Sequence, residues 1–324
     1  MIISRTPFRV SFSGGGSDLK WFYSKYGGAV ISMAIDRHVY ISGHPMFDSN
    51  ETLVKYSRIE NVDDVRKVAH PIFRAALLKY GISGVDLGVS SDIPAGTGLG
   101  SSSAFTVGLC NLLSAYRGQY LAREELARVA CEIEIDELRQ NIGKQDQYAS
   151  ALGGINLINF NKNGEVSYEP LPLSESSLEW LNSCLLLVRV GDTRSASEVL
   201  DNQTALSKDN LKIEESLLEL AQIARDAYYQ LAERIDLLGK IVQKSWELKK
   251  ISHPNASTLE IDGIISEALN RGAIAGKLLG AGKSGFVLLV VNPEARERLV
   301  EFFSDRKTIK VSLDQIGSSI IYSH

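Results

Sequence analysis

The chain has 324 residues and a formal net charge of −4, with apolar residues at 44% and charged residues at 23%. This composition is typical of a soluble globular protein with room for two domains. It lacks the basic excess that nucleic acid binding requires and any run of about 18 apolar residues, so neither nucleic acid nor membrane is expected as a partner.

Three cysteines, Cys110, Cys131 and Cys184, lie far apart in the sequence. Their number is odd, and no spacing matches a disulfide framework or a metal site. Cys110 and Cys131 fall in apolar helical patterns, where a buried thiol behaves as a small hydrophobic residue. The N-terminus also lacks the apolar stretch of a signal peptide. We therefore expect a reducing compartment, the cytoplasm.

The first half of the chain mixes strand and helix patterns. β-Branched residues and alternation predict strands over 1–13, 29–44, 52–57, 84–94 and 155–160. Apolar residues at helical spacing predict helices over about 62–80, 101–116, 122–140 and 145–152. The helix over 101–116 is apolar almost all round, which predicts that it is buried.

The second half begins after a polar stretch over 161–178, where we place a domain boundary that gives domains 1–170 and 171–324. Strands are predicted over 184–191, 273–279 and 285–291 and near 308–322, and helices over about 195–235, 237–250, 257–271 and 293–305. Because strands and helices mix without strict alternation, the pattern indicates an α+β fold.

The stretch "IPAGTGLGSSS" at 93–103 predicts a phosphate cradle. A helix start leaves about four backbone N–H groups without partners, and positive partial charge gathers there. Gly96, Gly98 and Gly100 keep Cβ atoms away, so a phosphate can approach those groups directly. Hydroxyls of the following serines can bond phosphate or Mg²⁺. The cofactor-binding residues predicted in this way are Pro94, Gly96, Thr97, Gly98, Leu99, Gly100, Ser101, Ser102 and Ser103.

A flexible turn followed by a serine N-cap is the alternative interpretation of this stretch. The dinucleotide fingerprint does not fit, because its third glycine would fall at Ser101. The later stretch "GKLLGAGKS" does not fit a P-loop either, because the required first glycine would fall at Lys277.

Three blocks in order, "TPFRVSFSGGGSD", "PAGTGLGSSSA" and "KLLGAGKSGF", resemble the GHMP kinases over the whole chain. The resemblance implies an N-terminal domain like the second domain of ribosomal protein S5 and a ferredoxin-like C-terminal domain. ATP would lie between them. The form of the first block, with "GGAVISMAIDRHVYI" after it, is similar to the heptose kinases of the superfamily, with fucokinase-type domains as the nearest rivals.

The resemblance implies catalytic roles for two residues. Asp146 in "GKQDQYASALGG" matches the superfamily aspartate that accepts the proton of the sugar hydroxyl. From the sequence alone, Asp146 could instead be a helix cap. Arg9 matches the basic residue of the first block and could pair with Asp146 and stabilise the transferring phosphoryl group; a surface charge is the alternative.

The metal site implied by the resemblance consists of Ser102 and Glu134. Both supply the hard oxygen that Mg²⁺ prefers. Glu134 lies within an acidic cluster, so a neighbouring carboxylate or a solvated acidic face are alternatives.

The sugar is expected to contact small residues that expose backbone N–H groups, together with Asp18, which can accept hydroxyl hydrogens. Arg194 could bind a phosphate bidentately, although a surface arginine fits as well. The predicted substrate residues are Arg9, Gly14, Gly15, Gly16, Ser17, Asp18, Asp146, Arg194, Gly280, Ala281, Gly282 and Lys283.

The predicted function is therefore a kinase that uses ATP and Mg²⁺ to phosphorylate the anomeric hydroxyl of D-glycero-D-manno-heptose 7-phosphate, on the route to GDP-activated heptose. The alternatives are another small-molecule kinase of the superfamily, such as a fucokinase-type enzyme, or a sugar or nucleotide sensor on the same fold. The expected partners are the sugar phosphate and ATP, with a homodimer left open.

Overall fold

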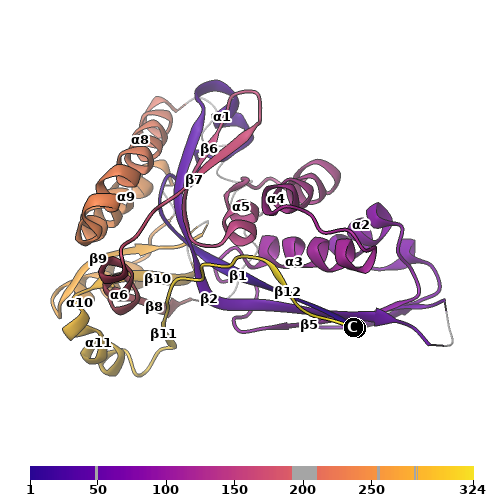
Figure 1. The fold of residues 1–324 in the computed structure, drawn as a ribbon. Coiled ribbons are helices and arrows are strands. Elements are labelled where there is room, and N and C mark those ends of the chain that lie inside the picture. The colour runs from indigo at the N-terminus through magenta and orange to yellow at the C-terminus, as the bar shows by residue number, and fades with distance from the viewer. Residues whose placement is uncertain (48–49, 192–209, 254–255, 281, 283) are drawn as a thin grey trace.

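The computed structural model describes residues 1–47, 50–191, 210–253, 256–280, 282 and 284–324. It contains two sheets with helices packed on them, and a long helical hairpin stands beside the bent strand β2 (Figure 1). The architecture is α+β, as the mixture of patterns in the sequence predicted.

The larger sheet holds eight strands of the described residues, in the order β12-β1-β2-β5-β3-β4, with β6 and β7 added beside β2. All neighbours are antiparallel except β3 and β5. The bounds are β1 Ile2–Ser13, β2 Gly28–Pro45, β3 Thr52–Lys55, β4 Ile59–Val62, β5 Val85–Ser91, β6 Ile155–Phe160, β7 Val166–Pro170 and β12 Ser319–Ser323.

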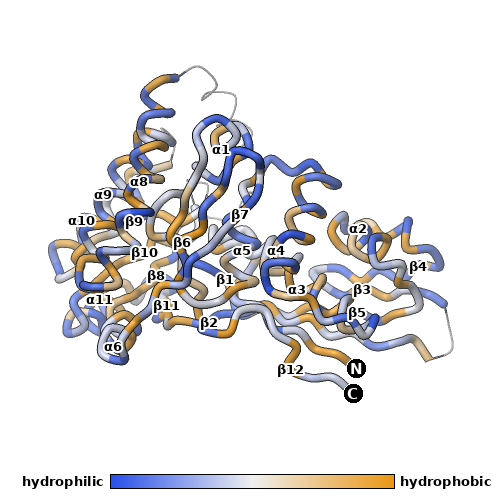
Figure 2. Tube along the Cα trace, turned by 45° about the horizontal axis from the view of Figure 1, so that its top comes forward, coloured by the Kyte–Doolittle hydropathy of each residue, from blue (hydrophilic) through white to orange (hydrophobic). Residues whose placement is uncertain are grey.

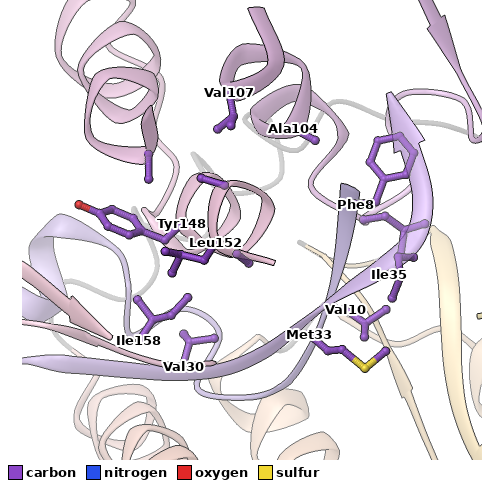
Figure 3. Packing of buried hydrophobic residues seen from close by; sticks show 14 of the residues in the cluster. Phe8, Val10, Val30, Met33, Ile35, Ala104, Val107, Tyr148, Leu152 and Ile158 are labelled. Atoms are coloured by element: carbon purple, nitrogen blue, oxygen red, sulfur yellow. The ribbon is translucent and has the colours of Figure 1, made fainter. Parts of the chain in front are cut away.

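Helices α2 to α5 cover one face of this sheet (Figure 1). The buried cluster beneath them joins Phe8 and Val10 of β1 to Ala104 of α3 and Tyr148 of α5 (Figure 3). This packing holds the N-terminal ends of α3 and α5 in fixed positions above the sheet. The helices are α1 Lys20–Tyr26, α2 Pro71–Tyr80, α3 Ser101–Tyr116, α4 Arg123–Cys131 and α5 Gln145–Leu152, with the 3₁₀ turn η1 at Val65–Lys67.

The second sheet has the order β11-β8-β10-β9 and is antiparallel. Numbered along the chain, this order is 4-1-3-2, with helices between the first two strands and between the last two, as the predicted ferredoxin-like domain requires. Its elements are α6 Glu175–Cys184, β8 Leu185–Val190, α8 Leu211–Glu233, η3 Ile235–Leu237, α9 Leu238–Ser252, α10 Leu259–Leu269, β9 Ala273–Leu278, β10 Gly285–Val291, η4 Pro293–Ala295, α11 Arg296–Phe302 and β11 Thr308–Lys310.

After the second sheet the chain returns to the first sheet, where its last strand, β12, pairs with β1. The two ends of the chain consequently lie side by side (Figure 2), and the amino group of Met1 donates to the carbonyl of His324 at 2.8 Å. The predicted boundary between residues 170 and 171 therefore does not separate the two sheets fully, because β12 follows this boundary but belongs to the first sheet.

Three local predictions need correction. The helix predicted over about 62–80 is α-helical only over Pro71–Tyr80, because β4 ends at Val62 and a 3₁₀ turn follows at Val65–Lys67. The helix predicted over 122–140 is α-helical only to Cys131, and Glu132–Glu137 forms a π-helical turn, η2. Such wide turns change which side chains face inward, which residue spacing alone does not reveal. The polar stretch over 161–178 also contains β7 and the start of α6, because the polar residues there lie on exposed surfaces. The three cysteines are free and buried.

Among the helices that the structure describes, none combines the length and the apolar character needed to cross a membrane.

Candidate functional site

A cavity of about 390 Å³ lies where the two halves of the chain meet. The first half contributes Arg9 of β1, the glycine turn after it, the 95–103 loop and the start of α5. The second half contributes Leu220 of α8, the inward face of α9, Lys277 of β9 and the loop after β9. Segments from both halves therefore form one site.

The predicted phosphate cradle lies on the wall of this cavity. Gly96, Gly98 and Gly100 have φ values of 75°, 79° and 73°, which strongly favour glycine. Helix α3 begins at Ser101 directly after this turn, and its first N–H groups have no partners within the helix. The cavity is lined here by Ala95, Gly96, Gly98, Gly100, Ser101, Ser102 and Ser103.

Pro94, Thr97 and Leu99 support the loop instead of lining the cavity. The Thr97 hydroxyl donates to the Pro94 carbonyl at 3.1 Å, and Leu99 is fully buried. The Leu99 carbonyl accepts from the backbone N–H of Arg9 at 3.1 Å, which fixes the loop to β1.

Arg9 and Asp146 form an ion pair beside the cradle. The Nε of Arg9 donates to Oδ1 of Asp146 at 2.7 Å, and its Nη1 donates to the carbonyl of Gly98 at 2.8 Å. The Arg9 side chain is 5% exposed and the Asp146 side chain 25%. A Cβ at Gly100 would lie 3.2 Å from Oδ2 of Asp146, so the carboxylate lies directly at the start of α3.

Asp18 is a second carboxylate in the cavity wall. It accepts from the backbone N–H of Gly16 at 3.0 Å and of Gln145 at 3.2 Å, and from the Gln145 side chain at 3.3 Å. Burial, and next the nearby charge of Asp146, raise the pKa of Asp18 to about 6. A carboxylate in this setting can accept hydrogen bonds from a polyhydroxy ligand.

Glu134 lies next to Ser102 of the cradle, but only Ser102 is among the residues that line the cavity. The Ser102 hydroxyl donates to Glu134 Oε1 at 3.0 Å, and the Gln147 amide donates to Oε2 at 2.7 Å. The Glu134 side chain is fully buried, and this burial raises its pKa. Other carboxylates of the acidic cluster instead pair with surface cations, as Glu132 and Glu137 do with Lys79. The π-helical turn thus directs Glu134 inward.

Three cationic or potentially cationic side chains line the cavity from the second half. Lys277 donates to the Phe12 carbonyl at 3.1 Å, and Lys249 donates to the carbonyls of Leu278 at 2.8 Å and Gly280 at 2.7 Å. His253 lies next to Gly16, where a Cβ would approach its ring to 3.1 Å. Burial lowers the pKa of Lys277 to about 7 and that of His253 to about 3, and it lowers the pKa of Lys249 as well.

Comparison with known proteins identifies the family. Residues 65–154 match the GHMP kinases N terminal domain, and residues 221–307 match the GHMP kinases C terminal domain. The chain is also 30% identical over 318 residues to the D-glycero-alpha-D-manno-heptose 7-phosphate kinase of Campylobacter jejuni subsp. jejuni, covering 93% of this chain and 92% of that one. This chain belongs to the GHMP kinases. It is therefore an ATP-dependent kinase.

Other GHMP kinases are similar at lower identity. A galactokinase of Thermotoga neapolitana is 26% identical over 349 residues, which covers 97% of each chain. A crystal structure of a D-glycero-D-manno-heptose 1-phosphate kinase from Bacteroides thetaiotaomicron superposes with a TM-score of 0.81 and 24% identity, covering all of both chains. The likeness to this crystal structure confirms the predicted GHMP kinase fold.

The remaining predicted substrate residues fall into three groups. Gly15, Gly16, Gly280 and Gly282 line the cavity. Gly14 and Ser17 build the turn instead, since the Ser17 hydroxyl donates to the carbonyls of Gly14 and Ala29 at 2.7 and 3.0 Å. The last group lies outside the described residues and consists of Arg194, Ala281 and Lys283.

In this GHMP kinase, the residues of α9 and β9 were not among the predicted site residues. Lys277 was considered only as the residue that breaks the P-loop pattern. Ser245 and Lys249 lie four residues apart on one face of α9, and His253 follows four residues later, directly after the helix ends at Ser252. This four-residue spacing of polar residues, on a helix face that otherwise packs inward, was the feature of the sequence that could have identified them.

Proposed function

We propose that this kinase phosphorylates the anomeric hydroxyl of D-glycero-D-manno-heptose 7-phosphate in the cytoplasm, on the route to GDP-activated heptose. The observation that carries the proposal is the Arg9–Asp146 pair at the start of α3, inside a cavity that also holds Asp18. The similarity to the Campylobacter jejuni heptose 7-phosphate kinase supports the choice of sugar.

In the proposed reaction, the cradle binds the triphosphate and Asp146 receives the proton of the sugar hydroxyl. The hydroxyl oxygen then forms a bond to the γ-phosphorus while the bond to the ADP oxygen breaks. Because phosphoryl transfer depends mainly on position and charge, the protein has to align these groups and offset the developing negative charge. Arg9 is placed for the second task, since it holds both Asp146 and the Gly98 carbonyl of the cradle.

We propose Ser102 and Glu134 as the residues that hold Mg²⁺. The donor set fits, because both side chains offer hard oxygen atoms and the partners recorded for Glu134 are neutral. A buried carboxylate with only neutral partners is stabilised when a cation binds. Bound Mg²⁺ would neutralise charge on the phosphates.

Glu134→Gln tests this metal site. We expect the concentration of Mg²⁺ needed for half-maximal activity to rise at least about tenfold, because a charged ligand is lost. The rise in melting temperature that Mg²⁺ with ADP gives the wild type should also shrink. Glu137→Gln, at an exposed carboxylate of the same turn, is the control. An unchanged Mg²⁺ requirement in Glu134→Gln would contradict the assignment.

A panel of sugars with coupled ADP detection tests the proposed substrate. Turnover should be fastest with D-glycero-D-manno-heptose 7-phosphate, and the product should carry a second phosphate at the anomeric carbon. Faster turnover of free fucose, or of galactose, would reject the heptose proposal in favour of another acceptor. Binding of sugar and ATP without any ADP release would instead favour a sensor.

The acidic side of the pH profile tests Asp18. Since its pKa lies near 6, the carboxyl gains a proton as the pH falls below about 6 and then accepts fewer hydrogen bonds. We expect kcat/KM for the sugar to fall about tenfold per pH unit below that point. In Asp18→Asn the activity should start from a lower plateau and lose this steep fall, leaving only the shallower dependence that comes from the sugar's own phosphate, whose second pKa is about 6. If the variant keeps the wild-type dependence, the titrating group is another residue.

A further inference from the structure

Helix α9 and strand β9 place an unusual set of polar groups against the cavity. Lys249 and Lys277 are 9% and 3% exposed, and Ser245 is fully buried. The hydrogen bonds recorded for the two ammonium groups go to backbone carbonyls of Leu278, Gly280 and Phe12. Two buried cations held by neutral acceptors are unfavourable until an anion joins them.

The hydroxyl of Ser245 gives a second, independent indication of a ligand. Ser245 is one of the residues that line the cavity, and its Oγ is buried and has no hydrogen-bond partner among the described residues. Buried polar groups are nearly always paired, so an unpaired one directed at a cavity indicates a missing partner. Ser245 lies one helical turn before Lys249, on the same face of α9.

The set begins at the phosphate cradle and extends away from it: Lys249 binds the carbonyl of Gly280, which lies against Gly98 of the cradle, whereas Lys277 reaches further along β1. Lys277 reaches the carbonyl of Phe12, three residues beyond Arg9 on β1, which is about 10 Å along a strand. Asp146 and the phosphate cradle lie at the Arg9 end, and His253 lies beside Gly16 at the other. A sugar phosphate with its anomeric oxygen at Asp146 can extend along β1 toward these groups.

We infer that Ser245, Lys249 and Lys277 form a second anion subsite, which binds the phosphate that the sugar already carries before the reaction. The inference rests on the proposed function and identifies the acceptor as a phosphorylated sugar. A phosphate monoester offers several acceptor oxygens, which suits two ammonium groups and one hydroxyl. The ring of His253, kept neutral by burial, closes the subsite beside Gly16.

The pH dependence of sugar phosphate binding is one test of this subsite. The charged and titratable groups that line the cavity together with Lys277 are Arg9, Lys249, His253, Asp18 and Asp146. Since burial, and next the charge of Arg9, place the pKa of Lys277 near 7, the free enzyme loses this cation as the pH rises above 7. Binding of a phosphorylated sugar should therefore weaken above pH 7, whereas binding of the unphosphorylated sugar should not.

Lys277→Met and Ser245→Ala test the subsite, with Lys250→Met as a control that removes an exposed lysine from the same helix. Calorimetry is done with the ATP site filled by a nonhydrolysable analogue. Lys277→Met should bind heptose 7-phosphate about 30-fold more weakly, as the loss of a charged hydrogen bond predicts, and should bind free heptose unchanged. Ser245→Ala should bind heptose 7-phosphate about threefold more weakly and should bind free heptose unchanged.

A second experiment uses inorganic phosphate, so its result does not depend on which sugar the enzyme accepts. With the analogue bound, excess phosphate should raise the melting temperature of the wild type and of Lys250→Met, but not that of Lys277→Met. If heptose 7-phosphate fails to bind the wild type while this difference persists, the heptose proposal fails and the subsite stands. An equal rise in all three proteins, or weaker binding of the analogue itself in Lys277→Met, would overturn the subsite.

Discussion

Asp146→Asn is expected to lower kcat by about 10³-fold while the affinity for ATP changes little. A general base contributes roughly 10² to 10⁴ to the rate, and an amide cannot take up the hydroxyl proton. Because Asn keeps the shape of the side chain and one oxygen near Arg9, the cradle should stay intact. Rapid-quench measurement of the chemical step, with ATP binding followed by calorimetry, separates the two effects.

Asp136→Asn is the matched control for this prediction, since Asp136 is an exposed aspartate on the nearby π-helical turn. It should retain the wild-type kcat. A kcat for Asp146→Asn within tenfold of the wild-type value would mean that the hydroxyl loses its proton elsewhere, and that Asp146 only orients the substrate.

Gly98→Ala is expected to raise KM for ATP by more than tenfold. At Gly98 the phosphate loop lies against the loop after β9, and a Cβ there would be 2.8 Å from the carbonyl oxygen of Leu279. Gly280, on the opposing loop, also has no room for a Cβ, which would lie 2.5 Å from the Cα of Gly98. Two backbones that touch in this way must separate to admit a methyl group, which displaces the N–H groups that bind phosphate.

Gly118→Ala separates the steric effect from backbone strain. Gly118 has a φ of 69°, close to the 79° of Gly98, but no heavy atom lies within 4 Å of its ideal Cβ. Both variants carry the strain of a left-handed alanine, about 1 kcal/mol, and both should lose a similar part of their stability to it. Only Gly98→Ala should lose ATP affinity. Equal KM values in the two variants would show that the contact between the loops does not position ATP.

The sequence predicted the parts of the site that depend on local pattern. Glycines at 96, 98 and 100 before an apolar run indicate a loop and a buried helix, and the structure has both. The choice of Glu134 within its acidic cluster came from the family resemblance, because residue spacing cannot show that a π-helical turn rotates this carboxylate inward. The role of Glu134 stays a prediction until it is measured.

The part that escaped prediction depends on contacts between distant segments. Lys277 meets Phe12 across 265 positions of the chain, and Lys249 meets the loop after β9. In the sequence, "ELKKISH" resembles the charged surface of any amphipathic helix. Only the docking of α9 and β9 onto β1 shows that these cations are buried, and no local periodicity encodes that docking.

The pairing of β12 with β1 has a consequence for biosynthesis. The outer edge of Ile2–Arg5 has its partner in Ser319–Ser323, so a ribosome must make residues 319–323 before that edge is covered. During translation, an exposed strand edge can recruit another nascent chain. Termination before residue 319 would therefore leave a product prone to aggregate, even though every residue of the cavity had already been made.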